Sequence, residues 1–121
     1  MQLKPFGYPR EVRLLNARDY QTVFNKVEIK ASCEHCLLLA RTNNLTHPRL
    51  GFIFSKKNIR HAVQRNRIKR ITKDYYRLNQ HDLPKLDIII MARKGIDQLS
   101  NEEIRNLLKK QFHKLAKRAS K

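Results

Sequence analysis

Tryptophan is absent from this sequence, cysteine occurs twice and glycine three times, and no apolar run approaches the ~20 residues that span a bilayer. The N-terminus also lacks the apolar centre of a signal peptide. These absences favour a cytoplasmic protein. Acidic side chains are scarce too, since 10 Asp and Glu accompany 27 Lys and Arg, a net charge of +17 in 121 residues. Because such an excess repels itself in a compact chain, we expect a polyanionic partner, with nucleic acid as the first candidate and an anionic membrane surface as the second.

The two cysteines, Cys33 and Cys36, stand in the segment Cys-Glu-His-Cys. A structural zinc site needs about four ligands at suitable spacing, and the sequence has no second paired motif to complete one. We therefore predict two reduced thiols, with Cys36 packed as a small hydrophobe, and no metal held by the isolated protein.

Clustered carboxylates of the kind that hold two catalytic metals are also missing. His61 has no acid or nucleophile spaced to orient it as a general base. We predict no catalytic residue in the protein, and we assign the scattered acids mostly to caps and loops: Asp82, Asp87, Asp97, Glu102 and Glu103.

Apolar periodicity predicts one α+β domain over residues 1–121, with the order α-β-β-β-α-β-α. Residues 1–12, with two prolines and a glycine, are expected to form an irregular N-terminal arm. A first helix runs from an Asn16 cap to about Lys26. Short strands follow at residues 27–31, 36–41 and 50–54. The loop of residues 42–48 is expected to join the last two strands as an antiparallel pair.

Later elements have clearer signals. Residues 87–92, DIIIMA, read as a strand buried on both faces, which two helices would cover. Gly51 in the preceding strand predicts a bulge or a close approach. Ser100 and Glu103 form a capping box for the last helix. Its apolar face is predicted to carry Ile104, Leu107, Leu108, Phe112, Leu115 and Ala119, and its other faces Arg105, Lys109, Lys110, Lys114, Lys117 and Arg118.

Residues 56–77 hold nine of the 27 Lys and Arg residues and no glycine or proline. We predict one long helix here, capped by Ser55 or Asn58 and ending near Asn79. Its apolar side is expected to carry Ile68, Ile71, Tyr75 and Leu78.

The opposite side of that helix is cationic. Arg65, Lys69 and Lys73 form a ridge at i, i+4 and i+8, with Asn66 and Arg70 beside it. Like charges at this spacing destabilise a helix, and RNA phosphates would offset the repulsion. A solvated basic face is the alternative, and the net charge favours phosphate binding.

The segment AVQRNRIKR at residues 62–70, preceded by GFIFSKK at residues 51–57, resembles the signature of the bacterial ribonuclease P protein component. The family pattern is an Arg-Asn pair followed by Lys-Arg, on a helix entered from a Ser-Lys-Lys strand end. The resemblance covers nearly the whole chain, including Asp19-Tyr20, Val23-Phe24 and DIIIMARKG at residues 87–95.

This resemblance implies a two-layer α+β sandwich with a left-handed βαβ crossover, an exception to the usual hand. It implies the protein subunit of a ribonucleoprotein endonuclease that removes the 5′ leader from precursor tRNA. The RNA subunit performs the hydrolysis with bound Mg²⁺, while the protein docks on the catalytic RNA, positions the leader and aids metal affinity. The expected partners are that RNA and precursor tRNA, with no membrane, and a monomeric protein when free.

The resemblance also implies two sets of site residues. Tyr20 and Phe24 line a cleft for the leader, although helical spacing alone assigns both to the core, and Phe24 stays shared between the two roles. Cys36 and Leu38 share one strand face and are expected to form the cleft floor, where the family often has an aromatic residue near Leu38. The residues implied to bind RNA are Lys56, Lys57, Arg60, Arg65, Asn66, Arg67, Lys69, Arg70 and Lys73.

Two other classes share the size and charge. A ribosomal or other structural RNA-binding protein is the main alternative, and the linked motif in its strand-helix context favours ribonuclease P over it. A DNA-binding regulator is the third reading, and the chain lacks a short helix-turn-helix pair.

Overall fold

Helices cover both faces of a mixed β-sheet in this computed structural model, which describes residues 17–43, 45, 47–79 and 82–119. The predicted α+β order is confirmed within those residues, and the expected N-terminal arm lies outside them. The elements are α1 (Ala17–Asn25), β1 (Ile29–Ser32), β2 (Cys36–Thr42), β3 (Arg49–Ile53), α2 (Ala62–Asn79), β4 (Leu86–Ala92), the 3₁₀ helix η3 (Ile96–Gln98) and α3 (Asn101–Ala119).

Strand β4 lies between β2 and β3, in the order β1-β2-β4-β3. It pairs antiparallel with β2 and parallel with β3. The predicted direct pairing of the strands at residues 36–41 and 50–54 is therefore wrong. β4 takes the central place because all but one of its residues are buried, which a position between two strands and two helix layers satisfies. The parallel pair is joined through α2, as a βαβ crossover requires, and its left hand stays a prediction.

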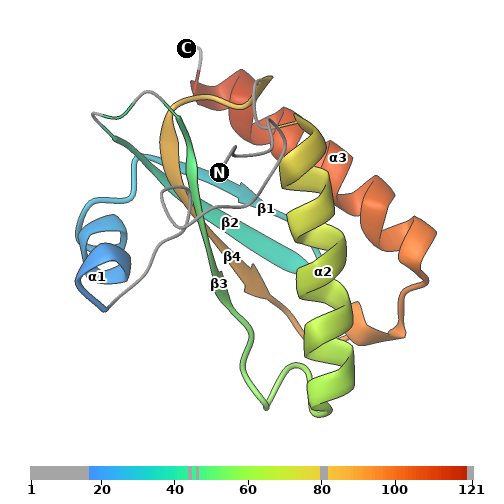
Figure 1. Cartoon of the computed structure of the whole chain (residues 1–121). Helices are drawn as coiled ribbons and strands as arrows, with labels where there is room; N and C mark the ends of the chain where they lie inside the picture. The colour runs from blue at the N-terminus through green and yellow to red at the C-terminus, as the bar shows by residue number, and fades with distance from the viewer. Residues whose placement is uncertain (1–16, 44, 46, 80–81, 120–121) are drawn as a thin grey trace, which may run out of the picture.

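Figure 1 shows α2 and α3 side by side on one face of the sheet and α1 on the other. The larger core lies under α2 and α3, where Leu38, Ile88 and Ile90 are at most 1% exposed. The smaller core lies under α1, where Val23 packs against Leu39 and Ile89. The predicted burial of β4 on both faces is confirmed.

The long cationic helix begins later than predicted. Ser55 caps a separate turn, accepting at Oγ from the Asn58 amide at 3.2 Å and at its carbonyl from the Ile59 amide at 2.9 Å. α2 starts only at Ala62, because the turn is held elsewhere: Ile59 is fully buried, and the Asn58 side chain donates to the Ala92 carbonyl at 2.9 Å. The predicted end at Asn79 is confirmed.

The apolar side of α2 is rotated from the predicted one. Ile68 and Ile71 are buried as expected, but Leu78 is 59% exposed. Tyr76 is fully buried instead, and its hydroxyl donates to the Pro48 carbonyl at 2.7 Å. Tyr75 is half-buried.

Helix α3 begins as its sequence predicts. Glu103 accepts from the Ser100 amide at 2.9 Å, and Ser100 Oγ accepts from the Glu103 amide at 3.1 Å, which is the reciprocal capping box. These hydrogen bonds lower the pKa of Glu103. The predicted apolar face is confirmed at Ile104, Leu108, Phe112 and Leu115, all buried.

Candidate nucleic-acid interface

The cations of residues 56–73 form a basic surface, which we call the α2 surface. It joins the turn before α2 to the outer side of that helix. Lys56, Lys57, Arg60, Asn66 and Arg70 are exposed, while Arg65, Arg67, Lys69 and Lys73 are partly buried. The turn and the helix thus present separate groups of charge, because the chain bends at residues 55–61 rather than continuing as one helix.

Two lysines of the predicted ridge lie over aromatic rings, that of Phe52 in β3 and that of Phe54 just after it. Lys69 Nζ is 5.9 Å from the centre of the Phe54 ring, and Lys73 Nζ is 5.9 Å from the centre of the Phe52 ring. Four residues of helix rise about 6 Å and two residues of strand about 6.6 Å, so the two spacings match along the antiparallel pair of elements. The cation–π contacts fix the ammonium groups along the β3 side of α2.

The two arginines of the Arg-Asn-Arg segment donate hydrogen bonds to acceptors inside the protein. Arg65 Nη1 donates to the Ile59 carbonyl at 2.8 Å and to the Arg60 carbonyl at 3.1 Å, which ties the preceding turn to the helix. Its Nε and Nη2 donors have no such contact among the described residues. Arg65 therefore supports the turn with one edge of its guanidinium and offers the other edge.

Arg67 is bound inside the protein on nearly every donor. Its acceptors are Gln64 Oε1 at 2.8 Å, Asn101 Oδ1 at 2.7 Å and the carbonyls of Asp97 and Leu99 at 3.2 and 3.1 Å. A guanidinium has five N–H groups, so little remains for a phosphate. Arg67 is a positioning residue that fastens α2 to η3 and to the start of α3, a role that the motif did not reveal.

Tyr20 projects from α1 onto the backbone of β3. Its hydroxyl accepts from the Phe52 amide at 3.0 Å and lies 3.4 Å from the Phe52 carbonyl. Gly51 permits this approach, because a Cβ there would lie 2.6 Å from the Tyr20 hydroxyl. The predicted close approach at Gly51 is confirmed. Phe24, one turn further along α1, is 38% exposed.

The predicted cleft floor at Cys36 and Leu38 is wrong. Their exposed fractions are 1% and 0%, and both pack in the larger core beneath α2 and α3, on the face opposite Tyr20 and Phe24. Side chains alternate across a strand, so an error of one residue moves the whole set to the other face. Burial also raises the pKa of the Cys36 thiol far above its usual range.

The side chains beside α1 come from the neighbouring positions. Leu37, Ile53 and Met91 are partly buried and pack around Val23, together with Tyr20. Sequence reasoning missed these three. The alternation of side chains along a strand was the available signal. Arg41 shares a strand face with Leu37, and Asp87 shares one with Met91. Because charged side chains lie on this face of the sheet, it is the face that is less completely covered.

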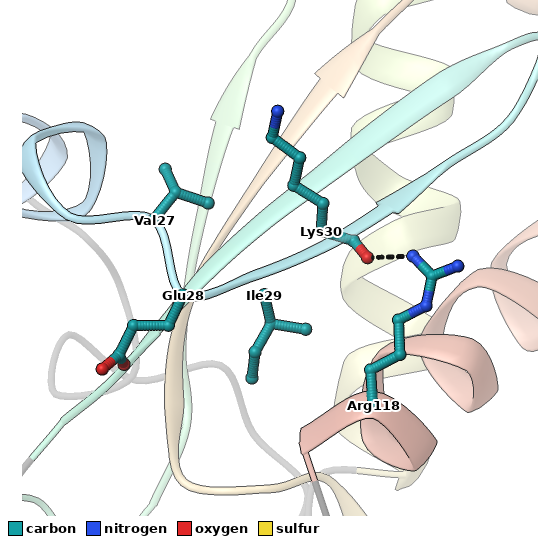
Figure 2. A pocket seen from close by; sticks show the side chains of 5 residues that line it. All are labelled: Val27, Glu28, Ile29, Lys30 and Arg118. Carbon is teal, nitrogen blue, oxygen red and sulfur yellow. Dashed lines mark hydrogen bonds between the residues drawn. The ribbon is translucent and has the colours of Figure 1, made fainter. Parts of the chain in front are cut away.

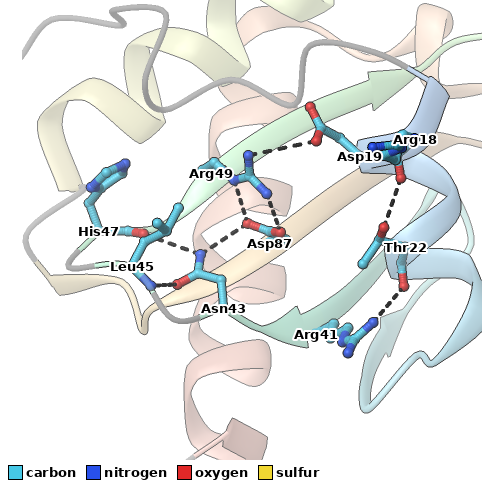
Figure 3. A network of polar contacts seen from close by, with 9 residues as sticks. All are labelled: Arg18, Asp19, Thr22, Arg41, Asn43, Leu45, His47, Arg49 and Asp87. Atoms are coloured by element: carbon cyan, nitrogen blue, oxygen red, sulfur yellow. Dashed lines mark hydrogen bonds and ion pairs between the residues drawn. The ribbon is translucent and has the colours of Figure 1, made fainter.

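A polar network holds α1 to the same face (Figure 3). Arg49 donates from Nε and Nη2 to the two carboxylate oxygens of Asp87 at 2.8 and 2.7 Å, and its Nη1 lies 3.8 Å from Asp19 Oδ1 on α1. These hydrogen bonds raise the pKa of Arg49. Asn43 also donates to Asp87, at 2.9 Å. Asp87 lies in β4 as predicted, and its carboxylate belongs to an ion-pair network that connects the sheet to α1 rather than to a cap or a loop.

At the opposite edge of the sheet, cations of α3 contact the backbone of β1. Lys114 Nζ donates to the Ser32 carbonyl at 3.2 Å, and Arg118 donates to the Lys30 carbonyl beside the shallow hollow drawn in Figure 2. Both carbonyls belong to β1, whose outer edge has no strand partner among the described residues. These two cations therefore cover an open strand edge, which limits pairing with another chain.

Metal-ligating side chains do not gather in the described part of the chain, where no three His, Cys, Asp or Glu residues lie close enough to hold an ion. Cys33 Sγ and Cys36 Sγ are 3.6 Å apart, and both thiols are free. In the same part of the chain, no helix combines the length and apolarity that crossing a bilayer requires.

A family model described as Ribonuclease P matches residues 8–116. The chain is 48% identical over 111 residues to the Ribonuclease P protein component of Chromohalobacter salexigens, covering 92% of this chain and 87% of the relative. It is similar to the RNase P protein of Staphylococcus aureus, with a TM-score of 0.79 and 26% identity over 87% of this chain and 97% of that one. The RNase P protein of Thermotoga maritima has a TM-score of 0.67 and 29% identity, over 81% and 96%.

Proposed function

Since the chain belongs to the bacterial ribonuclease P protein family, we propose that it binds the catalytic RNA and the 5′ leader of precursor tRNA. The proteins of this family are components of the endoribonuclease that processes tRNA. In this proposal the chain promotes the magnesium-dependent cleavage that leaves the mature tRNA 5′ end. The RNA carries out the chemistry. The protein contributes binding and positioning, through two surfaces on opposite sides of the sheet edge formed by β3.

The α2 surface is proposed to dock on the catalytic RNA, and its exposed positive charge is the observation that carries the proposal. Arg70 and Asn66 are exposed, and Arg70 has no internal partner among the described residues. Phosphates bind such side chains through charge-assisted hydrogen bonds, and each contact releases counterions. Lys69 and Lys73 are held by aromatic rings at 5.9 Å, so ordering them on RNA costs less side-chain entropy.

The leader is proposed to lie against the face of the sheet beside α1. Phe24 offers an exposed ring, and Leu37, Ile53 and Met91 offer partly buried apolar surface next to Tyr20. Unstacked bases rest on such surfaces without sequence preference, at about 1–3 kcal/mol per base for an aromatic ring. Cys36 and Leu38 act only by packing the sheet from its other side.

Magnesium is the cofactor that the family implies. The described side chains do not supply a donor set for it, so we assign the ions to the RNA. The protein's contribution is charge: cations that neutralise nearby phosphates relieve repulsion between RNA segments that must approach the ions.

Reconstitution tests this function. The protein is combined with a bacterial ribonuclease P RNA at low magnesium, and cleavage of precursor tRNAs with short and long leaders is measured. We expect the protein to stimulate cleavage, more strongly for the long leader. Phe24→Ala should remove the dependence on leader length and retain docking, whereas Arg70→Ala should weaken docking for both substrates.

Lys94→Ala is the matched control for loss of one exposed cation, since Lys94 lies in the loop after β4. It should behave as the unmodified protein does. Tight binding to ribosomal RNA without any stimulation of precursor tRNA cleavage would contradict the proposal.

A further inference from the structure

A groove between α2 and α3 lies outside both of the proposed RNA-binding surfaces. It consists of two adjoining hollows of about 210 and 220 Å³, and Tyr75 and Lys109 border both. Figure 1 shows the two helices side by side on the face of the sheet opposite α1. At 100° per residue, Leu78 in this groove lies about 140° around α2 from Lys73, so the groove and the lysine ridge are on different flanks of the helix.

The floor of the groove is apolar and aromatic. The Tyr75 ring stacks on Phe112, with ring centres 5.4 Å apart and planes at 26°. Leu78 is 59% exposed beside it, and Ile71 also lines this hollow. An exposed leucine next to a half-buried tyrosine is surface that a planar apolar ligand would cover.

The α3 wall of the groove is cationic. Arg105 and Lys109 line it, and Lys110 lies at the adjoining surface hollow with His113. Among the described residues, none of these three cations has a hydrogen bond or ion pair, in contrast to Lys114 and Arg118 on the other flank.

Two acids, Asp74 and Asp82, line the groove opposite its cations. Asp74 lies 3.8 Å from Arg77 and is partly neutralised by it. Asp82 borders the second hollow, and its charge, after burial, contributes to raising the pKa of Tyr75. The wall stays net positive, and the chain as a whole carries +17.

We propose that this groove binds a single-stranded RNA segment, separate from the RNA on the α2 surface. A base covers Tyr75 and Leu78, while the adjoining phosphates pair with Arg105, Lys109 and Lys110. An aromatic floor with a cationic wall is the combination that binds single strands without reading sequence. An acidic peptide is the competing occupant, and the net charge together with the RNA context of the family favours RNA. The inference does not require that the α2 surface binds the catalytic RNA.

The test is a titration of the full chain with a short oligouridylate, too short to span both surfaces, followed through the backbone amides by two-dimensional NMR. We expect two separate groups of shifted amides, one around Arg70 and one around Leu78 and Lys109, with an upfield ring-current shift of the uracil protons on Tyr75. Arg105→Glu with Lys109→Glu should abolish the second group and retain the first. Lys94→Glu with Lys117→Glu, the same total charge change at exposed positions outside the groove, should retain both.

Inorganic polyphosphate is the second probe, since it has the charge without the bases. Equal shifts of the amides around Leu78 and Lys109 with polyphosphate and with oligouridylate would reduce the groove to a general anion site and overturn the proposal. So would oligouridylate shifts confined to the α2 surface, a result that leaves the proposed function intact. Loss of shifts at the α2 surface alone would instead count against the proposed function. Groove shifts caused only by an acidic peptide would assign it to a protein partner.

Discussion

The hydroxyl of Tyr20 lies 2.6 Å from the position that a Cβ on Gly51 would occupy. Gly51 lies in β3, and its φ is not positive. The position therefore needs a glycine for the space that a side chain would fill, and not for backbone freedom. The contact joins α1 to the edge strand and sets where the aromatic side of α1 meets the sheet.

Gly51→Ala should therefore displace the Tyr20 ring and destabilise the protein by about 1–3 kcal/mol, the usual effect of overpacking. Urea unfolding measures the change. On a Tyr20→Ala background the same substitution should cost nothing, because the ring that it meets is gone. Equal stability of Gly51→Ala and the unmodified protein would show that the ring moves away without loss.

Removing one partner of the Arg49–Asp87 pair should be costly. Arg49→Met leaves Asp87, whose side chain is 8% exposed, with Asn43 as its remaining side-chain donor among the described residues. Breaking a buried pair costs about 3–5 kcal/mol, and the 24% exposure of Arg49 reduces our expectation to about 2–3 kcal/mol. Asp87→Leu with Arg49→Met should recover most of the loss in a double-mutant cycle. Additive losses would contradict direct coupling.

Arg67 and Arg70 stand three residues apart on α2 and should respond in opposite ways to alanine. Arg67→Ala removes four internal hydrogen bonds and should cost about 2–3 kcal/mol of stability. Arg70→Ala should change stability by less than about 0.5 kcal/mol. In RNA binding measured against salt concentration, it should lower the slope by about one phosphate contact. Similar stability losses for both variants would remove the distinction.

The two thiols should differ in alkylation. Burial raises the pKa of Cys36, so its thiolate fraction is small at every pH below that raised value, while Cys33 is partly exposed. With reductant present at about pH 8, iodoacetamide should modify Cys33 and leave Cys36 protected until denaturant is added. Mass spectrometry follows the two sites. Cys33→Ser should leave a protein that reacts only on unfolding, and rapid labelling of that variant would contradict the burial of Cys36.

The sequence predicted correctly those features that depend on residues close together along the chain. The capping box at Ser100 depends on residues three positions apart, and the run at residues 87–92 is apolar enough to require cover on both faces. The start of α2 was misplaced because Ser55 is a good cap in isolation. Its turn is instead held by the Asn58 contact to Ala92, 34 residues away. Such a contact leaves no trace in the periodicity of residues 56–77.

Strand order and strand face failed for a related reason. Residues 36–41 and 50–54 are neighbours along the chain, and nothing within either segment says that β4 separates them. The face of Cys36 and Leu38 depends on which helices cover the sheet, and β2 is apolar enough on both sides to fit either assignment.

The sequence by itself determined a basic single-domain α+β chain with an RNA-binding helix, because composition, periodicity and a linked motif are properties of the chain. The tertiary structure alone decided which cations of that helix are available. Arg67 and Arg70 are chemically identical in the sequence, and only the position of η3 and α3 against α2 turns the first into an internal clamp and leaves the second exposed. Partners contributed from 30 or more residues away cannot be read from the helix that they constrain.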